Sequence, residues 1–502
     1  MMPSSHDADI TLLLEGTYPF TRGGVSSWAH QLIEGLPERS FNLVHLGAKR
    51  RGEEVTRYKL PPNVKQVLCF YLMDDVCPLK PVARAGCPKY FDSSSKLHDW
   101  FRSPIGEPSQ EWVDQVILQN GQKPEKGTVD FFTSEAAWAQ ICASYSQNCP
   151  DESFNAYFWA VRNMHAPLMK MANFARAIPP STVFHALSTG YAGLLGAMLK
   201  QLTGRPLILT EHGIYTKERR IDLQSLFLEE LEGWFEQPSH SGMQYHKLLW
   251  SRMFEGMGRL TYSAANPIIT LYELNRQHQI SDGADPARTL IIPNGVHVEF
   301  YAPLRALRPR EIPRVLGLIG RIVPIKDIKT FIRAIAVLAA SMPDIEGWLI
   351  GPEEEDPTYV NECRALVTSL RLEDHIRFLG FQKVEDVLPK LGLLVLTSIS
   401  EAFPLVIGES HASGLPVLAT DVGACRDLIE GKGADDRMLG FAGEVIPIAD
   451  PEAIARAAFG LLTDPARWQA AQRAGIERVE RYYRQSQVID SYREIYQRIG
   501  AL

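Results

Sequence analysis

The sequence has few of the features that mark membrane, secreted or nucleic-acid-binding proteins. None of its 502 residues falls in a run of 18 consecutive apolar residues, the length that a membrane-spanning helix needs. The apolar run at 10–14 is too short for the core of a signal peptide, and no basic segment precedes it. A net charge of −7, without a long lysine or arginine run, gives no electrostatic basis for binding nucleic acid. We therefore expect a cytoplasmic protein.

Cysteine-based sites and two common nucleotide motifs are also missing. The seven cysteines form no C-x-x-C pair. Cys69, Cys77 and Cys87 could be read as metal ligands, but their wide intervals favour free thiols. The sequence contains no G-x-x-x-x-G-K-[ST] and no G-x-G-x-x-G that opens a helix, so P-loop and dinucleotide-binding classes are excluded.

The length and the pattern of hydrophobic residues predict two α/β domains. A chain of 502 residues exceeds a single core, and two domains of about 200–250 residues are the natural division. Short apolar runs alternate with helical patterns in both halves, which is typical of a mostly parallel sheet covered on both faces. We expect an N-terminal domain at 1–300 and a C-terminal domain at 301–480. The proline-containing segment 297–313 is the candidate linker.

A stretch of about a hundred residues, 77–177, departs from the α/β pattern. Its apolar residues recur at helical spacing and predict an all-helical insertion in the N-terminal domain. Its aromatic residues are typical of a packed core, although an acceptor groove or a partner surface stays open. These residues are Trp100, Trp112, Phe131, Phe132, Trp138, Phe154, Phe158 and Trp159.

Two candidate site segments lie in the N-terminal half. Gly23 and Gly24 stand between a predicted strand and an amphipathic helix, where bare backbone lets a ligand approach closely. A simple turn with two glycines is an equally good interpretation. His212 follows a predicted strand and precedes a glycine, and a side chain in that place faces the ligand-binding edge of an α/β sheet. A structural histidine is the alternative.

The densest group of candidates lies in the C-terminal half. Glu401 and Glu409 bracket a predicted loop-to-helix junction in the stretch 398–420, which follows a predicted strand at 393–396 and ends in another at 416–419. We expect Pro404 to open that helix and Gly414 to end it, and the free N–H groups at its start can face a diphosphate. Arg321 and Lys326 lie on another loop after a strand, where they would clamp a diphosphate and stabilise its charge as a leaving group. Two solvated surface cations are the alternative.

Three motifs resemble a known family when they are taken together. They are P-N-G-V at 293–296, G-R-x-x-x-x-K-D at 320–327, and E-x-F-P-L-x-x-x-E at 401–409 followed by G-L-P-V. In this combination they resemble the retaining family 4 glycosyltransferases of the GT-B fold. The opening E-G-T-Y-P-F-T-R-G-G-V-S-S-W, the segment E-H-G-I-Y and the helical insertion look closest to the enzymes of Pel exopolysaccharide biosynthesis.

The resemblance implies a fold and an activity. The fold would be two Rossmann-like domains facing a crevice, with a final helix at 481–502 crossing back to the N-terminal domain. The activity would be transfer of a hexose or N-acetylhexosamine, with retention of configuration, from a UDP-sugar to a polysaccharide acceptor. An inner-membrane polysaccharide synthase complex would be the partner. No metal and no other cofactor is expected, in agreement with the absence of a D-x-D motif near a predicted strand end.

The resemblance also assigns roles to single residues. Arg321 and Lys326 would hold the diphosphate, and Glu409 the ribose hydroxyls. Glu401 and the backbone of the next four residues would hold the donor sugar, and His212 would contact that sugar near its anomeric carbon. Gly23 and Gly24 would close on the phosphates, and Asn294 belongs to the same nucleotide-sugar site. The four residues after Glu401 are Ala402, Phe403, Pro404 and Leu405.

Three other functions stay open on the sequence alone. A glycosyltransferase of another cell-surface glycan and a nucleotide-sugar epimerase use the same scaffold. A phosphorylase does so as well, but we find no pyridoxal lysine site. A nucleotide-sugar-binding subunit of a membrane complex, without catalysis, is the non-enzymatic alternative.

Overall fold

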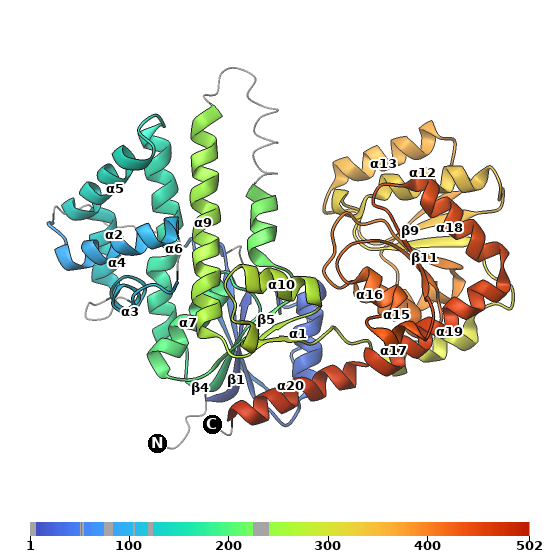
Figure 1. Cartoon of the computed structure of the whole chain (residues 1–502), viewed down its shortest axis with the longest axis horizontal. Helices are drawn as coiled ribbons and strands as arrows, with labels where there is room; N and C mark the ends of the chain where they lie inside the picture. Colours follow the sequence, from blue (N-terminus) through green and yellow to red (C-terminus); the bar gives the residue numbers. More distant parts are fainter. Residues whose placement is uncertain are drawn as a thin grey trace. The chain divides into compact units, whose positions relative to one another are not determined.

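The structure of the chain is a computed structural model that divides into two units. It describes residues 7–50, 52, 55–74, 84–103, 106–118, 124–223 and 240–500. The first unit comprises residues 1–291 with 493–502, and the second comprises 292–492 (Figure 1). The division falls after Ile291, whereas the sequence suggested residue 300. Cys77 and the first residues of the expected insertion lie outside the described residues.

The first unit is built on a seven-stranded parallel sheet in the order β3-β2-β1-β4-β5-β6-β7. Every residue of β2 is buried, as are six of the eight residues of β1. Such continuous apolar strands are expected where helices cover both faces of a sheet. The strands are β1 (Ala8–Glu15), β2 (Phe41–Gly47), β3 (Val64–Tyr71), β4 (Ser181–Ala186), β5 (Leu207–Glu211), β6 (Ile268–Thr270) and β7 (Thr289–Ile291).

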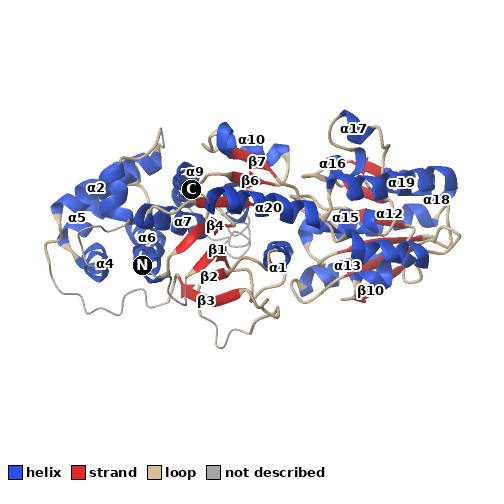
Figure 2. Ribbon diagram, turned by 90° about the horizontal axis from the view of Figure 1, so that it is seen from below, coloured by secondary structure: helices blue, strands red, loops and turns tan. Residues whose placement is uncertain are grey.

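Helices cover both faces of this sheet (Figure 2). On one face lie α7 (Tyr191–Thr203) and α9 (His240–Ala264), and on the other lies α1 (Gly24–Gly35). Near the sheet edge, α10 (Glu273–Ser281) packs against β6 and β7. Trp28 of α1 is buried against the sheet, because the apolar positions of this helix recur at its inward face.

The insertion is helical throughout its described part and packs on α7 and α9. Trp100 and Phe131 are buried in its core, while Trp138 and Trp159 are about half exposed. Its elements are α2 (Pro88–Arg102), α3 (Gln110–Trp112), a π-helical turn (Val113–Ile117), α4 (Pro124–Thr133), α5 (Glu135–Asn148) and α6 (Phe154–Ala177).

The second unit contains a six-stranded parallel sheet in the order β10-β9-β8-β11-β12-β13. The strand at Gly443–Ile446 adds an edge that the sequence pattern did not predict. The strands are β8 (Val315–Ile319), β9 (Glu346–Ile350), β10 (Ile376–Gly380), β11 (Leu393–Leu396), β12 (Val417–Thr420) and β13 (Gly443–Ile446). Two parallel sheets with helices confirm the predicted fold class.

The helices of the second unit pack in two groups, α12 with α13 and α18, and α15 with α19. The longer helices are α12 (Ile328–Ala339), α13 (Pro357–Ser369), α15 (Leu405–Ala412), α18 (Pro451–Thr463), α19 (Pro465–Tyr482) and α20 (Gln485–Gly500). The shorter ones are α11 (Val298–Tyr301), α14 (Val384–Val387), α16 (Cys425–Glu430) and α17 (Ala434–Arg437). Residues 493–500, the last part of α20, belong to the first unit, where the Tyr496 hydroxyl contacts His185 Nδ1 at 2.6 Å.

The interpretation of 297–313 as a linker is wrong. Most of this segment is helical, as α11 and a 3-10 helix (Ala302–Leu307), and it lies within the second unit. Arg305 donates to the Ala412 carbonyl at 2.7 Å, and Arg308 donates to the Leu388 and Leu391 carbonyls. Prolines are tolerated here because they open or follow helical turns.

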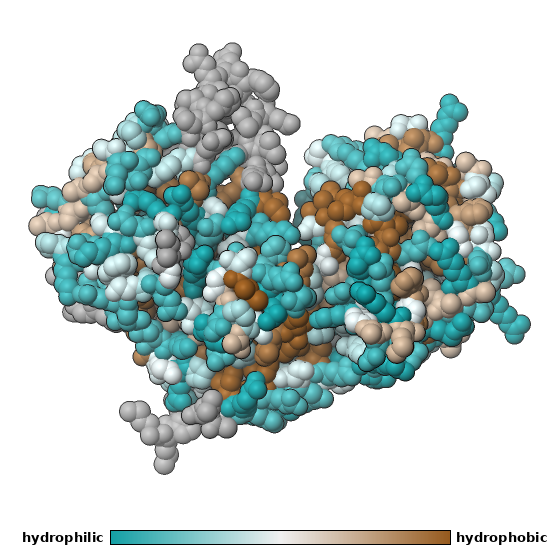
Figure 3. Space-filling view, in the orientation of Figure 1, coloured by the Kyte–Doolittle hydropathy of each residue, from teal (hydrophilic) through white to brown (hydrophobic). Residues whose placement is uncertain are grey.

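The visible surface of each unit is mostly hydrophilic. Figure 3 shows teal side chains over most of this face, with smaller brown areas among them. Within the described part of the chain, no helix is both long enough and apolar enough to span a membrane.

Candidate functional site

A lysine–glutamate pair lies at the carboxyl edge of the second sheet. Lys326 ends a 3-10 turn after β8, and Glu401 lies in the loop after β11. Lys326 Nζ is 2.5 Å from Glu401 Oε1, and Ser398 Oγ donates to the same oxygen at 2.7 Å. Both charged side chains are mostly buried, with 19% and 15% of their area exposed. Two of the predicted site residues are therefore brought together from positions 75 residues apart.

Backbone and side-chain hydrogen bonds hold the two loops in place. Ile399 N donates to the Ile325 carbonyl at 2.9 Å, and Thr397 Oγ1 donates to the Lys326 carbonyl at 2.7 Å. Asp327 has a left-handed φ of 46° and its carboxylate caps α12 through Thr330 N. These contacts fix the Lys326 backbone before any ligand arrives, which is the arrangement expected of a preorganised charge site.

Gly423 supports the Glu401 loop from the end of β12. Its φ is +55°, and a Cβ built there would lie 2.3 Å from the Glu401 carbonyl oxygen. Ala424 N donates to the Ala402 carbonyl at 2.9 Å. Gly423 is not among the predicted site residues, although a glycine four residues after the predicted strand 416–419 is the available signal.

The α15 segment supplies Glu409 and differs from expectation at its start. Pro404 precedes the helix, which begins at Leu405, so its ring fixes the chain just outside the first turn. Burial raises the pKa of Glu409, while a hydrogen bond from Tyr301 of α11 acts in the opposite direction. The carboxylate therefore faces the Tyr301 hydroxyl as a donor and is partly shielded from bulk water. Phe403 is buried in the preceding loop, with its ring 5.8 Å from that of Tyr483.

The P-N-G-V segment is packed inside the second unit. Val296 N donates to the Tyr483 carbonyl at 2.7 Å, and Gln485 N donates back to the Val296 carbonyl at 2.9 Å. A Cβ on Gly295 would lie 2.5 Å from Gln485 Cα. Asn294 is buried, and its Oδ1 has no hydrogen-bond partner among the described residues. This motif thus joins the start of α20 to the rest of the second unit. The Asn294 amide oxygen takes no part in that connection.

Arg321 is not in contact with the Lys326–Glu401 pair. Its side chain is 54% exposed and pairs with Glu355 at 2.5 Å. An exposed ion pair of this kind contributes little to stability, so the guanidinium can be released at small cost.

The first unit holds the remaining predicted residues at the carboxyl end of β5 and the start of α1. His212 is 9% exposed, and its ring packs edge-on against Trp28 at 4.7 Å. Burial lowers the pKa of His212 to about 4, so the imidazole is neutral near pH 7. Among the described residues its Nε2 has no hydrogen-bond partner. Gly23 and Gly24 lead into the same helix as Trp28, and a Cβ on either would meet nothing within 4 Å.

Glu211, which is not among the predicted site residues, is a buried carboxylate beside His212. It accepts hydrogen bonds from the Thr189 hydroxyl at 2.9 Å, Tyr215 N at 3.1 Å, the Tyr262 hydroxyl at 2.7 Å and Gln279 Nε2 at 3.1 Å. Burial raises its pKa. This network anchors the end of β5 and so fixes the backbone position of His212, the next residue.

The described cysteines give no sign of a metal centre. Cys69 is exposed and Cys87 is half-buried, and neither forms a disulfide. Over the described ranges, no group of three or more histidine, cysteine, aspartate or glutamate side chains could hold a metal ion.

Comparison with known families decides where the chain belongs. Residues 8–287 match the family described as "Domain of unknown function (DUF3492)". The chain belongs to the DUF3492 family. In this DUF3492 protein, residues 313–464 also match the family described as "Glycosyl transferases group 1", which covers β8 to the end of α18 and so includes the loops of Lys326, Glu401 and Gly423.

Curated relatives are similar over part of their length. A D-inositol 3-phosphate glycosyltransferase of Kineococcus radiotolerans is 31% identical over 224 residues, or 41% of this chain and 51% of the relative. A phosphatidyl-myo-inositol mannosyltransferase of Mycolicibacterium smegmatis is 30% identical over 276 residues, or 52% of this chain and 64% of the relative. The chain thus spans about half to two thirds of the length of these relatives.

Solved structures share the fold at low identity. HepE of Anabaena, in complex with UDP and glucose, has a TM-score of 0.60 and 16% identity, with 98% of this chain and 99% of that chain covered. Sucrose-phosphate synthase of Thermosynechococcus elongatus has a TM-score of 0.57 and 16% identity, with the same coverage. The fold of the DUF3492 chain is therefore GT-B.

Proposed function

We propose that this chain is a retaining glycosyltransferase that moves a hexose or an N-acetylhexosamine from a UDP-sugar to a growing exopolysaccharide. The observation that carries the proposal is the Lys326–Glu401 pair, held at the carboxyl edge of the second sheet next to α15. A cation beside a helix start suits a diphosphate, and a carboxylate suits sugar hydroxyls. The match to the group 1 glycosyltransferases over 313–464 supports the same conclusion.

In this reaction the bond from the anomeric carbon to the diphosphate oxygen breaks, and a bond from the acceptor oxygen forms on the same face. The proton of the acceptor hydroxyl passes to the departing diphosphate. Lys326 and a released Arg321 would stabilise the charge that builds on that diphosphate. Glu401 would exchange its contact with Lys326 for donor hydroxyls, and Glu409 would bind the ribose. No metal is required by this set of roles.

The choice of donor and acceptor rests on similarity. HepE is described in complex with UDP and glucose, and we bring a UDP-sugar to this chain on that basis. The segments at 15–28 and 211–215 resemble PelF, the cytoplasmic glycosyltransferase of Pel exopolysaccharide biosynthesis. We therefore propose a cytoplasmic enzyme that acts beside an inner-membrane polysaccharide synthase complex.

Turnover of labelled donors tests the proposal. The full chain is incubated with labelled UDP-glucose, UDP-galactose and UDP-N-acetylhexosamines together with Pel-type oligosaccharide acceptors. We expect at least one donor to be transferred and to raise the melting temperature, since a ligand of the folded state must stabilise it. Isomerisation of a donor without an acceptor would indicate an epimerase, and binding without any turnover would indicate a binding subunit.

Variants connect the activity to the site. Lys326→Ala and Glu409→Ala should abolish transfer while the protein stays folded. Arg314→Ala is the control, because Arg314 also pairs with a carboxylate, Asp344, but in an exposed ion pair just before β8, at the opposite end of that strand. Full turnover in either site variant, or equal loss in the control, would contradict the assignment.

A further inference from the structure

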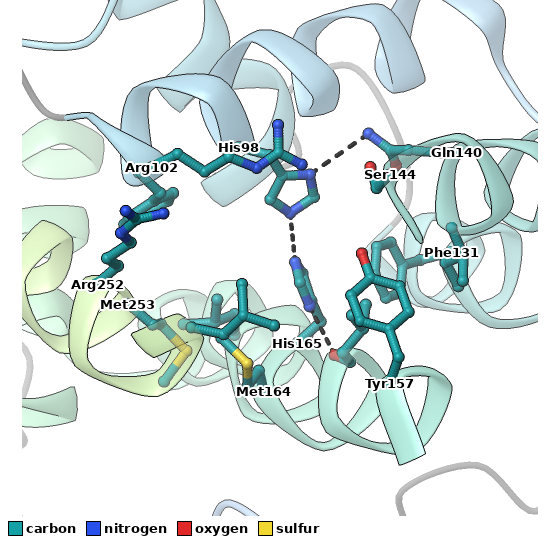
Figure 4. Close-up of a pocket in the computed structure, with 15 residues that line it drawn as sticks. His98, Arg102, Phe131, Gln140, Ser144, Tyr157, Met164, His165, Arg252 and Met253 are labelled. Carbon is teal, nitrogen blue, oxygen red and sulfur yellow. Dashed lines mark hydrogen bonds between the residues drawn. The ribbon is translucent and has the colours of Figure 1, made fainter. Parts of the chain in front are cut away.

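A pocket lies between the helical insertion and α9, and none of its lining residues belongs to the proposed donor site. It lies among α2, α4, α5, α6 and α9 and holds a cavity of about 80 Å³ that is partly open to solvent (Figure 4). A cavity of this size has room for several water molecules or for part of a small ligand. The pocket is built entirely within the first unit.

The polar part of the pocket wall is a chain of hydrogen bonds between uncharged groups. His165 Nδ1 is 2.7 Å from the Val161 carbonyl, which can only accept, so this nitrogen carries the hydrogen and Nε2 accepts. His98 Nε2 lies 2.5 Å from His165 Nε2 and must be the donor. His98 Nδ1 is then left to accept from the Gln140 amide at 3.4 Å. Burial lowers the pKa of both imidazoles, in agreement with two neutral rings.

The charge of the pocket comes from two arginines. Arg102 of α2 and Arg252 of α9 lie along the same side of the opening (Figure 4). The fifteen lining residues include no carboxylate. Arg102 pairs with Asp99, a residue outside the lining that is 69% exposed, at 2.5 Å. Arg252 forms no ion pair with any carboxylate that the structure describes. An uncompensated guanidinium beside a low-dielectric recess attracts an anion.

The floor of the pocket is apolar and adaptable. Met164, Met253, Leu168 and Phe131 form much of it, and the Phe131 ring stacks on His165 at 4.9 Å. Methionine side chains rearrange easily around irregular apolar groups, so the floor can accept a flexible chain or a ring. An inorganic anion alone would leave this surface uncovered.

We propose that this pocket binds an amphipathic anion, with its apolar body on the methionine-lined floor and its carboxylate or phosphate head at Arg252 and Arg102. The site is independent of the proposed transferase reaction, because none of its residues belongs to the donor site. Fatty acids and lipid phosphates share the required chemistry, and the head group distinguishes these two sources.

Binding is tested on the full chain by calorimetry and by thermal shift with octanoate, octyl phosphate, 1-octanol and acetate. We expect octanoate or octyl phosphate to bind at least about tenfold more tightly than octanol and acetate, because both the head and the body contribute. Equal affinity for octanol and octanoate, or no stabilisation by either anion, would overturn the proposal.

Three variants locate the site. Arg252→Gln should weaken anion binding about tenfold and leave octanol unchanged, since it removes a guanidinium that pairs with no carboxylate among the described residues. Lys96→Gln removes one charge from the exposed side of α2 and should change nothing. Ser144→Phe should block the half-buried wall of the pocket without lowering the melting temperature of the free protein. A Lys96→Gln effect as large as that of Arg252→Gln, or full binding in a folded Ser144→Phe protein, would refute the site.

Discussion

Gly423 lies so close to Glu401 that the two backbones leave no room for a side chain. A Cβ at position 423 would be 2.3 Å from the Glu401 carbonyl oxygen and 2.4 Å from that of Ala402. The loop that carries Glu401 toward Lys326 is therefore supported by the turn after β12. The position of the carboxylate depends on a residue that makes no contact with a ligand in the proposed reaction.

Gly423→Ala should lower both stability and transfer activity. The left-handed φ of +55° alone costs about 1 kcal/mol for alanine, and the clash with two carbonyls adds to that cost. Gly380→Ala is the control, because its φ of +61° is similar and its Cβ would meet nothing within 4 Å. Urea unfolding and donor turnover should show a larger loss at Gly423 than at Gly380. Equal losses of stability and turnover in the two variants would mean that the protein relieves the clash at position 423 without moving Glu401.

Ser398→Ala tests whether the orientation of Glu401 matters. Its hydroxyl donates to Glu401 Oε1 at 2.7 Å, and losing such a bond to a charged group costs about 1–3 kcal/mol. We expect turnover to fall about tenfold with the fold intact, whereas Glu401→Gln should lose more because it also removes the charge that Lys326 faces. Steady-state kinetics measure both, and an unaffected Ser398→Ala protein would contradict this positioning role.

Gly23→Ala and Gly24→Ala should separate stability from function. Neither added methyl group meets an atom within 4 Å. Gly24 is the first residue of α1, where alanine is favoured over glycine, so Gly24→Ala should keep or slightly raise the melting temperature. Gly23 is the N-cap, where alanine is less favourable than glycine, so Gly23→Ala should lower it slightly. Transfer should fall if these glycines admit the donor phosphates closely, as proposed. Unchanged turnover in both variants would favour the plain-turn interpretation of this segment.

Tyr301→Phe should move the acidic limb of the activity profile to higher pH. Burial raises the pKa of Glu409, and the hydrogen bond from Tyr301 lowers it, so removing the hydroxyl raises it further. If ribose binding needs the ionised carboxylate, activity must be lost at a higher pH in the variant. The pH dependence of kcat/KM for the best donor checks the direction, and a shift to lower pH would be incompatible with this role.

His185 should make the stability of the first unit depend on pH. The ring is fully buried between the Tyr496 and Thr210 hydroxyls, and burial lowers its pKa from 6.5 to about 3. A depressed folded-state pKa means that its stabilising contribution is complete above pH 6.5 and is lost as the pH falls. Between pH 7 and pH 5 the loss is roughly 2 kcal/mol. Urea unfolding of the parent and of His185→Asn should show the steeper pH slope in the parent.

The matched control for that experiment is His278→Gln on α10, where the ring is half-exposed. Its slope should equal that of the parent protein. An equal slope in the parent and in His185→Asn would show that other groups control the acid sensitivity.

Local sequence patterns located most of the elements, although not β13, and the ends of most strands. The apolar run at 393–396, Pro404 and Gly414 bounded the unit around Glu401 to within a residue or two, because turn and cap preferences act over short distances. The same patterns misread 297–313 as a linker. Its prolines are compatible with helical turns once Arg305 and Arg308 can reach distant carbonyls, and the sequence does not reveal those partners.

The sequence by itself determined that the chain is α/β in two halves and that charged residues follow its strands. The spacing of apolar residues, the composition and the turn preferences depend on residues that are close together in the sequence. They can therefore be read without knowing any tertiary contact. Only the tertiary structure decided that Lys326 reaches Glu401 while Arg321 pairs with Glu355. It also decided that Gly423 supports the Glu401 loop and that two arginines share the insertion pocket. These relationships depend on the order of the strands and on the packing of helices, which bring together residues far apart in sequence.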